Sequence, residues 1–216
     1  ARQSALIAEV ARIKPDIVLL CECNHFEEFW SHELRKMGFM GVWGAKFDEA
    51  AGIWPVPAYF RGAPSDGCAI FYSEGRFREV WSETFRFGKN STQLAQEALL
   101  ESTIAIEKGA FTRLLVGITH LKAGNRGADL RREQAAIWAE HLKQKLASAG
   151  ADTQLVLAGD MNEPREPTDK FQNVGGAVRL LETELGLTDA YIGAPPEVTS
   201  WGGTKWWCTI DYILHS

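Results

Sequence analysis

Residues 155–167 read LVLAGDMNEPREP, and the prediction of the fold starts from this stretch. The apolar run has the length of a buried strand, and it ends in Asp160, Met161 and Asn162. Pro164 and Pro167 then exclude a longer central strand and an immediate helix. Taken alone, Asp160 and Asn162 are either turn residues that hydrogen bond to their own backbone or members of a site at the edge of a sheet.

The same pattern, a buried strand with an ionisable side chain at its end, recurs at three other places. These are Glu22 in VLLCECN, His120 in GITHLKA and Asp211 in TIDYIL. Each also has a structural interpretation: a helix cap, a structural histidine and a buried hydrogen-bonding group. Four such strand ends favour a single site, because strand ends that meet at one rim are where sheet enzymes assemble their active sites. In its strand, Glu22 is expected to point away from a face that Cys21 and Cys23 share.

The surrounding patterns predict both helices and strands. Helical spacing is found at residues 6–13, 26–37, 128–148 and 177–186. Strands are expected at 16–22, 39–43, 67–72, 77–85, 98–107, 112–121, 153–160 and 208–216. Residues 47–66 hold three prolines and are expected to form a long surface loop. Consecutive strands with scattered helices predict an α/β (α+β) fold, in which sheets pack face to face and helices lie outside.

The longest predicted helix, residues 128–148, has an apolar side and a charged side. The apolar residues expected to face the core are Leu130, Ile137, Trp138, Leu142 and Leu146. A helix of this length with one apolar face is expected to cover a sheet.

Length and composition predict one globular domain, residues 1–216. Hydrophobic residues make up 45% and charged residues 24% of the chain, which is ordinary for a folded protein. The net charge of -5 excludes a broad basic face for tracking a long nucleic acid. No run of about 18 apolar residues is present, so we expect no membrane span. The four dispersed cysteines are expected to be reduced thiols in a soluble, monomeric, intracellular protein, cytoplasmic or in an organelle.

The residue types at the strand ends suit phosphoryl chemistry. Glu22 supplies a hard oxygen ligand, and Mg2+ typically takes one or two carboxylates together with waters and a substrate phosphate. Mn2+ accepts the same oxygen ligands. Asp160 is placed to orient or deprotonate a water molecule.

Other residues can contact a phosphate. Asn162 and His120 can donate hydrogen bonds to phosphate oxygens on which negative charge develops. Lys46 and Lys122 can add cationic contacts, although either residue alone is equally a solvated surface lysine.

A family resemblance rests on five segments in a fixed order: PDIVLLCECN, SDGCAIFY, THLKA followed by RREQ, LAGDMNEP and TIDYIL. Together they resemble the endonuclease/exonuclease/phosphatase superfamily, in its deadenylase branch of carbon-catabolite-repressor deadenylases and nocturnin. FMGVWGAK and TSWGGTKWWCTIDYI are nearer to the nocturnin type. The resemblance runs from residue 15 to residue 215. It implies a four-layer sandwich, with two packed mixed β-sheets between helices, and Mg2+-dependent hydrolysis of phosphoester bonds.

The resemblance also implies a role for each site residue. Glu22 would bind the metal, Asp160 would activate the water, and Asp211 would orient a histidine further along the family's chain. His120 and Asn162 would contact the reacting phosphate, Lys46 and Lys122 would hold substrate phosphate, and Trp201 would bind the substrate.

Several departures from the family pattern bear on function. Cys21 and Asn24 replace the usual Gln and Asp around the metal-binding Glu, and Gly202 and Gly203 follow Trp201 where nocturnin-like proteins carry basic residues. The family's first strand, with a metal-site Asn, and its later Ser-Asp-His motif do not occur. We interpret the chain as a partial domain that lacks terminal strands.

Three functions follow from the resemblance. The first is a 3'-5' exoribonuclease that shortens poly(A) RNA from its 3' end. The alternative is a phosphatase that removes the 2'-phosphate of NADP(H). A third reading is a non-catalytic relative that binds a nucleotide or a partner protein.

Overall fold

The computed structural model describes residues 2–47, 65–88, 91–104, 112–169, 171–194, 196, 198–201 and 207–216. The strands are β1 (Ile17–Leu20), β2 (Phe39–Ala45), β3 (Gly67–Ser73), β4 (Phe77–Arg86), β5 (Leu94–Ser102), β6 (Arg113–His120), β7 (Thr153–Asp160), β8 (Thr188–Asp189), β9 (Ser200–Trp201), β10 (Trp207–Cys208) and β11 (Asp211–His215). The helical segments are α1 (Arg2–Ile13), η1 (Phe26–Trp30), α2 (Ser31–Arg35), η3 (Asn125–Gly127), α3 (Ala128–Ala149) and α4 (Ala177–Leu185).

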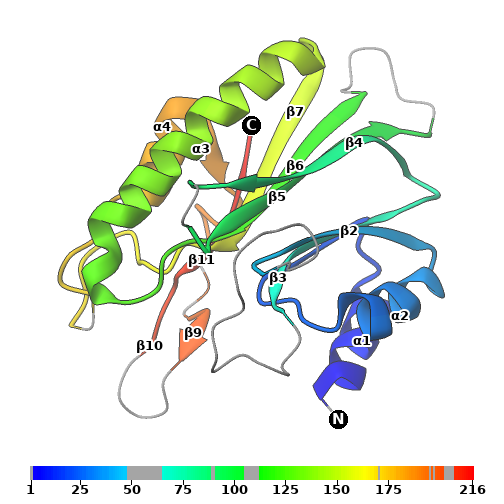
Figure 1. The fold of residues 1–216 in the computed structure, drawn as a ribbon, viewed down its shortest axis with the longest axis horizontal. Helices are drawn as coiled ribbons and strands as arrows, with labels where there is room; N and C mark the ends of the chain where they lie inside the picture. The colour runs from blue at the N-terminus through cyan, green and yellow to red at the C-terminus, as the bar shows by residue number, and fades with distance from the viewer. Residues whose placement is uncertain are drawn as a thin grey trace.

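Two β-sheets lie face to face, and helices cover their outer faces (Figure 1). In the described residues the larger sheet has the order β4-β5-β6-β7-β11-β8, and the smaller has the order β1-β3-β2. Strands β6 and β7 are parallel, whereas β7 and β11 are antiparallel, so the larger sheet is mixed. The strands of the smaller sheet pair antiparallel. The expected layered α/β architecture is confirmed.

Three clusters of buried apolar side chains separate the four layers. The first lies between α3, α4 and the larger sheet, the second between the two sheets, and the third between the smaller sheet and the helices α1, η1 and α2. In that order, the clusters include Trp138 and Leu157, Ile70 and Ile118, and Phe26 and Phe71. Each sheet is therefore covered on both faces, which explains why strands such as β3 and β6 read as nearly continuous apolar runs.

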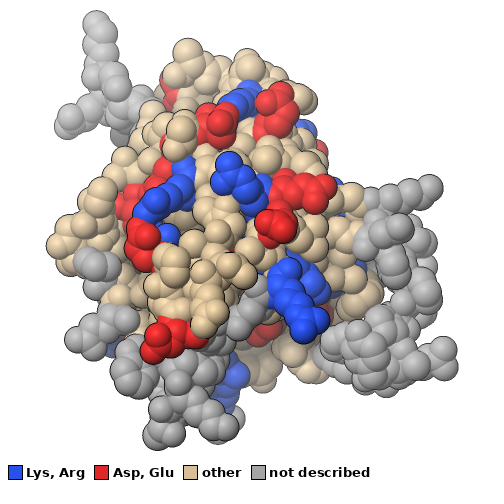
Figure 2. Space-filling model, turned by 90° about the vertical axis from the view of Figure 1, so that its left-hand side faces the viewer, with Lys and Arg blue, Asp and Glu red and all other residues tan. Residues whose placement is uncertain are grey.

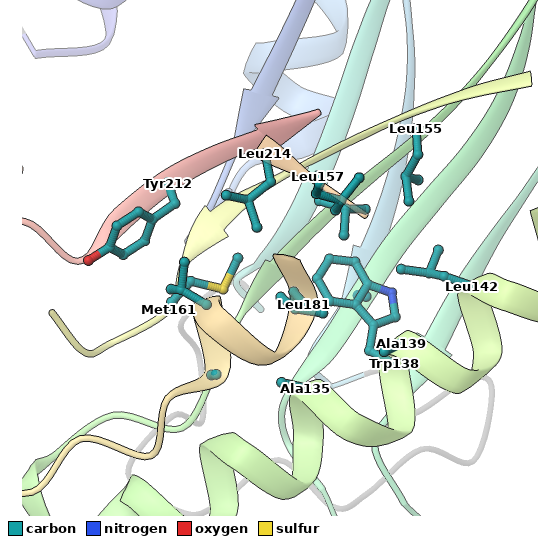
Figure 3. Close-up of a cluster of buried hydrophobic side chains, with 14 of the residues drawn as sticks. Ala135, Trp138, Ala139, Leu142, Leu155, Leu157, Met161, Leu181, Tyr212 and Leu214 are labelled. Carbon is teal, nitrogen blue, oxygen red and sulfur yellow. The ribbon is translucent and has the colours of Figure 1, made fainter. Parts of the chain in front are cut away.

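Trp138 is the centre of the first cluster. Figure 3 shows its ring reaching from α3 toward Leu157 of β7, with Leu142 and Leu181 beside it. Its indole N–H donates a 2.7 Å hydrogen bond to the carboxylate of Glu97, so the buried polar atom is satisfied. None of the helices in the described ranges is long and apolar enough to cross a bilayer.

The buried face of α3 differs from the one predicted. Trp138 and Leu142 are buried as expected, but Leu130 and Ile137 are exposed, at 41% and 39%. The buried face instead begins with Arg131, which is fully buried. Counting apolar residues failed here because a charged side chain occupies a core position and has a buried partner.

Other element boundaries also differ from the prediction. The helix expected at 26–37 begins as the π-helical segment η1 and ends with α2. The strand expected at 98–107 begins earlier, since β5 starts at Leu94, and residues 105–107 lie outside the described part of the chain. The strand expected at 208–216 is two strands, β10 and β11. Most of the loop expected at 47–66 lies outside the described residues as well.

Gly159 allows β6 and β7 to come together next to their last residues. Its φ angle is 153°, and a Cβ atom at this position would lie 2.0 Å from the carbonyl oxygen of Thr119 on β6. Because the obstructing atom belongs to the backbone, a side chain could be accommodated only if the two strands moved apart. The next residues on these strands are His120 and Asp160.

We expect Gly159→Ala to lower the free energy of unfolding by about 3 kcal/mol, because the added methyl group forces the paired strands apart. The measurement is chemical denaturation followed by circular dichroism. Gly75→Ala is the matched control, since the nearest atom to its added methyl group, Ser73 Oγ, lies 3.8 Å away. Equal unfolding midpoints for the two variants would contradict this account of Gly159.

Candidate active site

Strand register places three of the predicted residues next to one another. His120 at the end of β6 is paired with Asp160 at the end of β7. Asp160 is in turn paired with Asp211 at the start of β11. Because neighbouring strands lie only about 4.7–4.9 Å apart, the three side chains share one rim of the larger sheet.

The alternation of side chains directs all three toward the smaller sheet. Ile118 packs between the sheets, and His120, two residues later, shares its face. Leu157 and Leu214 pack on the side of α3 and α4. Asp160 lies three residues after Leu157, and Asp211 lies three residues before Leu214. Because three is an odd number, the two aspartates lie on the opposite face. The rim therefore opens between the two sheets.

Glu22 reaches this rim by way of a bulge. Strand β1 pairs with β3 as far as Leu20, which lies opposite Ala69. The next backbone hydrogen bond joins the amide of Cys23 to the carbonyl oxygen of Gly67 at 2.9 Å. Two residues of the first strand thus stand opposite one residue of the second, which is a β-bulge, a feature that often re-aims a side chain beside an active site. Glu22 is one of the two, and its φ angle is 51°.

The bulge corrects the prediction for the two cysteines. Cys21 packs between the sheets and Cys23 packs against the helices on the outer face, so they do not share a face. The extra residue shifts the alternation by one position. Glu22 consequently points to the rim, where its side chain is 71% exposed and one carboxylate oxygen lies 4.0 Å from Nδ1 of His120.

His120 lies between the acidic groups. Its Nε2 is 3.8 Å from Oδ2 of Asp160, and its Nδ1 faces Glu22. The Nδ1 atom is buried and has no hydrogen-bond partner in the described ranges. Since buried polar atoms nearly always have a partner, this nitrogen is available to a ligand.

Burial lowers the pKa of His120, and the positive charge of Lys46 lowers it further, against the opposing effect of Glu22. The imidazole is therefore neutral at pH 7, with one ring nitrogen as a donor and the other as an acceptor. The ammonium of Lys46 also forms a 2.8 Å ion pair with Asp66.

Asp160 has the electrostatic properties of a general base. Burial, followed by the charge of Asp211, raises the pKa of Asp160 to about 7, although the amide of Asn162 opposes the shift. Burial also raises the pKa of Asp211. A carboxylate with a pKa near the working pH can accept a proton and release it again.

Asn162 holds the turn that follows β7. Its φ angle is 54°, its amide N–H donates to Asp160 Oδ1 at 2.7 Å, and its side-chain nitrogen donates to the carbonyl oxygen of Leu121 at 2.9 Å. Asparagine tolerates this left-handed conformation better than most residues. Asn162 thus stabilises the turn through hydrogen bonds to the backbone and also lies at the rim. Its interpretation as a turn residue and its interpretation as a site residue are therefore compatible.

The other two predicted substrate contacts are Lys122 and Trp201. Lys122 follows β6 by two residues and its side chain is exposed, without a partner for its ammonium in the described parts of the chain. Trp201 belongs to β9, but its side chain lies outside what the structure describes.

Sequence reasoning missed Glu163 and Arg131, which support the rim loop. Both side chains are almost fully buried and form a 2.8 Å ion pair. Glu163 also accepts hydrogen bonds from the amides of Gly175 and Ala177, at 2.8 Å and 2.6 Å, at the start of α4. Arg131 donates in addition to two backbone oxygens of the segment after β6. The signal in the sequence was an arginine at a core position of an otherwise apolar helix face.

The donors at the rim fit a divalent metal ion. Glu22 offers an exposed carboxylate. Asp160 and Asp211 add oxygen atoms close by, since they are paired across neighbouring strands and the charge of Glu22 acts on both. An all-oxygen set with room for water and phosphate is what Mg2+ or Mn2+ requires.

A second group of possible ligands lies elsewhere. Glu83, Glu97 and His141 bring ligand atoms within 4.8 Å of one another. Glu97 belongs to the opposite face of the larger sheet, under Trp138 of α3. Nε2 of His141 lies 2.9 Å and 3.1 Å from the two carboxylates, and Lys145 forms an ion pair with Glu83. These contacts already engage all three side chains with partners from the protein.

We predict that Glu163→Gln destabilises the protein by about 3–5 kcal/mol, because it leaves the buried Arg131 charge uncompensated. Urea unfolding measures this loss. Glu184→Gln, which removes an exposed carboxylate paired with Lys143, is the control and should unfold almost as the wild type does. A loss of stability as small as that of the control would refute the role given to Glu163.

The raised pKa of Asp160 predicts a pH dependence of stability in the metal-free protein. The folded state holds a proton that the unfolded state releases at its ordinary pKa near 4, so stability falls between about pH 4 and pH 7. Asp160→Asn should lack this decline and be more stable at pH 7.5, by up to about 4 kcal/mol. Unfolding in EDTA across this pH range tests the prediction, and parallel pH profiles for both proteins would contradict it.

Comparison with known proteins agrees with this geometry. The sequence profile of the Endonuclease/Exonuclease/phosphatase family matches residues 1–216. Human nocturnin is 26% identical over 220 residues, which cover all of this chain and 48% of the human protein. Carbon catabolite repressor protein 4 homolog 1 from Arabidopsis thaliana is 29% identical over 195 residues, which cover 74% of this chain and 30% of the plant protein. The chain thus spans half or less of the length of these relatives.

Solved structures show the same fold. The human nocturnin catalytic domain, solved with a bound sulfate anion, matches with a TM-score of 0.75 and 25% identity, over 99% of this chain and 74% of that one. ANGEL2, a 2',3'-cyclic phosphatase, matches with a TM-score of 0.72 at 17% identity, over 99% of this chain and 73% of that one, which supports the fold alone. With its strand-end motifs and its family profile, the chain belongs to the endonuclease/exonuclease/phosphatase family, in the deadenylase branch.

Proposed function

We propose that this protein is a metal-dependent phosphoester hydrolase that removes nucleotides from the 3' end of poly(A) RNA. The observation that carries the proposal is the convergence of Glu22, His120, Asp160 and Asp211 on one rim, with the pKa of Asp160 raised to about 7. The family hydrolyses phosphoester bonds and is typically dependent on divalent metals. The poly(A) substrate comes from the relatives in the deadenylase branch.

The residues of the rim divide the work of hydrolysis. Glu22 would hold Mg2+ or Mn2+, which supplies Lewis-acid stabilisation of the charge on the phosphate oxygens. Asp160 takes the proton of the attacking water, and burial together with the charge of Asp211 keeps the pKa of Asp160 high enough for that task. His120 and Asn162 donate hydrogen bonds to the reacting phosphate.

Removal of the 2'-phosphate of NADP(H) is the second candidate, and the pairing of Lys46 with Asp66 favours it. Lys46 is neutralised by Asp66, which leaves Lys122 as the lysine of the predicted pair that has an unengaged ammonium in the described ranges. On the face that carries α3 and α4, Lys and Arg alternate with Asp and Glu (Figure 2). Single-stranded RNA is usually bound along a continuous cationic groove.

We expect the purified protein with Mg2+ or Mn2+ to shorten 5'-labelled oligo(A) stepwise. Glu22→Gln and Asp160→Asn should each lower the rate by about 100- to 10,000-fold while the circular dichroism spectrum is retained. The control is Glu184→Gln, on an exposed face of α4, which should keep full activity.

The same assay separates the candidates. Release of phosphate from NADPH with intact oligo(A) would reject the nuclease in favour of the phosphatase. A third outcome is that the folded protein binds oligo(A) or NADPH but turns over neither substrate with either metal. In that case the hydrolase proposal fails, and a non-catalytic binding role replaces it. Full activity in Asp160→Asn would refute its role as the base.

A further inference from the structure

Two cysteines face each other across the bulge that carries Glu22. The register of β1 and β3, continued by one residue beyond Leu20 and Ala69, brings Cys21 opposite Cys68. Both side chains pack in the cluster between the sheets, so they lie on the same face of the smaller sheet.

The position of the pair in the ladder also suits a disulfide. The amide of Ser73 donates to the carbonyl oxygen of Asp16 at 2.9 Å, so these two residues are a hydrogen-bonded pair. Hydrogen-bonded and non-hydrogen-bonded pairs alternate along antiparallel strands. The bulge interrupts this alternation, and its two residues, Cys21 and Glu22, stand opposite Cys68. Neighbouring strands lie about 4.7–4.9 Å apart. That spacing falls within the range of about 4.4–6.8 Å found in disulfides.

The two thiols differ in access. Cys68 is only 1% exposed, whereas Cys21 is half-buried and lines a cavity of about 430 Å³ together with Asp211. The neighbouring Cys21 thiol, together with burial, raises the pKa of the Cys68 thiol well above its ordinary value. A small oxidant that enters the cavity therefore meets Cys21 first.

We propose that Cys21 and Cys68 form a peroxide-sensitive pair, which closes a reversible disulfide across the bulge that carries Glu22. The part of this inference that concerns activity rests on the function proposed above. The formation of the bond rests on the positions of the two thiols alone.

The chemistry is balanced with hydrogen peroxide as the oxidant. The sulfur of Cys21 attacks one peroxide oxygen, the O–O bond breaks, and the departing hydroxide takes the thiol proton to form water. The resulting sulfenic acid is then attacked by the sulfur of Cys68: the S–S bond forms, the S–O bond breaks, and the proton of Cys68 leaves with the hydroxide as a second water. Two thiols are oxidised by two electrons, and peroxide is reduced to water.

Closing the bond would move the metal-binding bulge. In the reduced protein, the thiol of Cys21 donates to the carbonyl oxygen of Thr119, which precedes His120, at 3.2 Å. An S–S bond of about 2.05 Å draws the sulfur of Cys21 toward Cys68 and removes this donor. Glu22 is the adjacent residue, so its carboxylate shifts relative to His120. Displacement of groups that orient a metal ligand typically costs about 10- to 100-fold in metal affinity or activity.

The bond is tested by peptide mapping. The protein is reduced, freed of reductant, treated with hydrogen peroxide and blocked with N-ethylmaleimide, and its peptides are analysed by mass spectrometry without reduction. We expect the peptides of Cys21 and Cys68 to be joined, both in the wild type and in Cys23→Ala, the control whose thiol lies on the other face. Oxidation of Cys21 to the sulfinic acid without a cross-link, or a link between Cys21 and Cys23, would overturn the proposal.

The effect on the site is tested separately. Mn2+ binding, measured by calorimetry, should weaken by about 10-fold or more on oxidation and recover with dithiothreitol. Cys68→Ala, or Cys68→Ser if the alanine variant does not fold, should not show a reversible loss. A cross-linked protein that binds Mn2+ as the reduced protein does would refute the switch. Failure of the hydrolase assay in the reduced protein would count against the proposed function only, because mapping and Mn2+ binding do not depend on turnover.

Discussion

The buried ion pair between Arg131 and Glu163 joins four segments that surround the rim. Arg131 belongs to α3 and also bonds to the segment that follows β6, while Glu163 belongs to the loop after β7 and bonds to the first amides of α4. The negative carboxylate at the start of a helix is favourable for its dipole as well. Because Glu163 directly follows Asn162, the same contacts determine where the rim loop lies.

The rim itself is a consequence of strand register. A one-residue slip between β6 and β7 would turn His120 and Asp160 to opposite faces, since side chains alternate along a strand. Gly159 permits the close approach of these strands, and Glu163 holds the chain beyond them. The bulge after β1 then adds Glu22 from the other sheet. Site and fold are thus stabilised by the same backbone pairings.

Crowding of acidic groups in a half-buried rim gives the site its reactivity. Burial of Asp160 next to Asp211 raises the pKa of Asp160, and burial of His120 keeps the imidazole neutral. A metal ion held there would offset this negative charge, which is a physical reason for an apparently unfavourable arrangement. The neighbouring Cys21 and Cys68 place an oxidisable pair at the bulge that carries the metal ligand, and so couple the redox state of two core thiols to the position of Glu22.

The sequence by itself determined the layered α/β fold, the positions of most strands and the candidate residues Glu22, His120, Asp160, Asn162 and Asp211, because apolar periodicity and polar strand ends are local patterns. Tertiary structure decided the rest. Arg131 replaces Leu130 and Ile137 on the buried face of α3, Cys21 and Cys23 face opposite ways, and Lys46 is neutralised by Asp66. The burial of Arg131 and the pairing of Lys46 each depend on a partner distant in sequence, and the orientation of the two cysteines depends on one extra residue in a strand. A distant partner and a single extra residue leave no periodic pattern in the sequence.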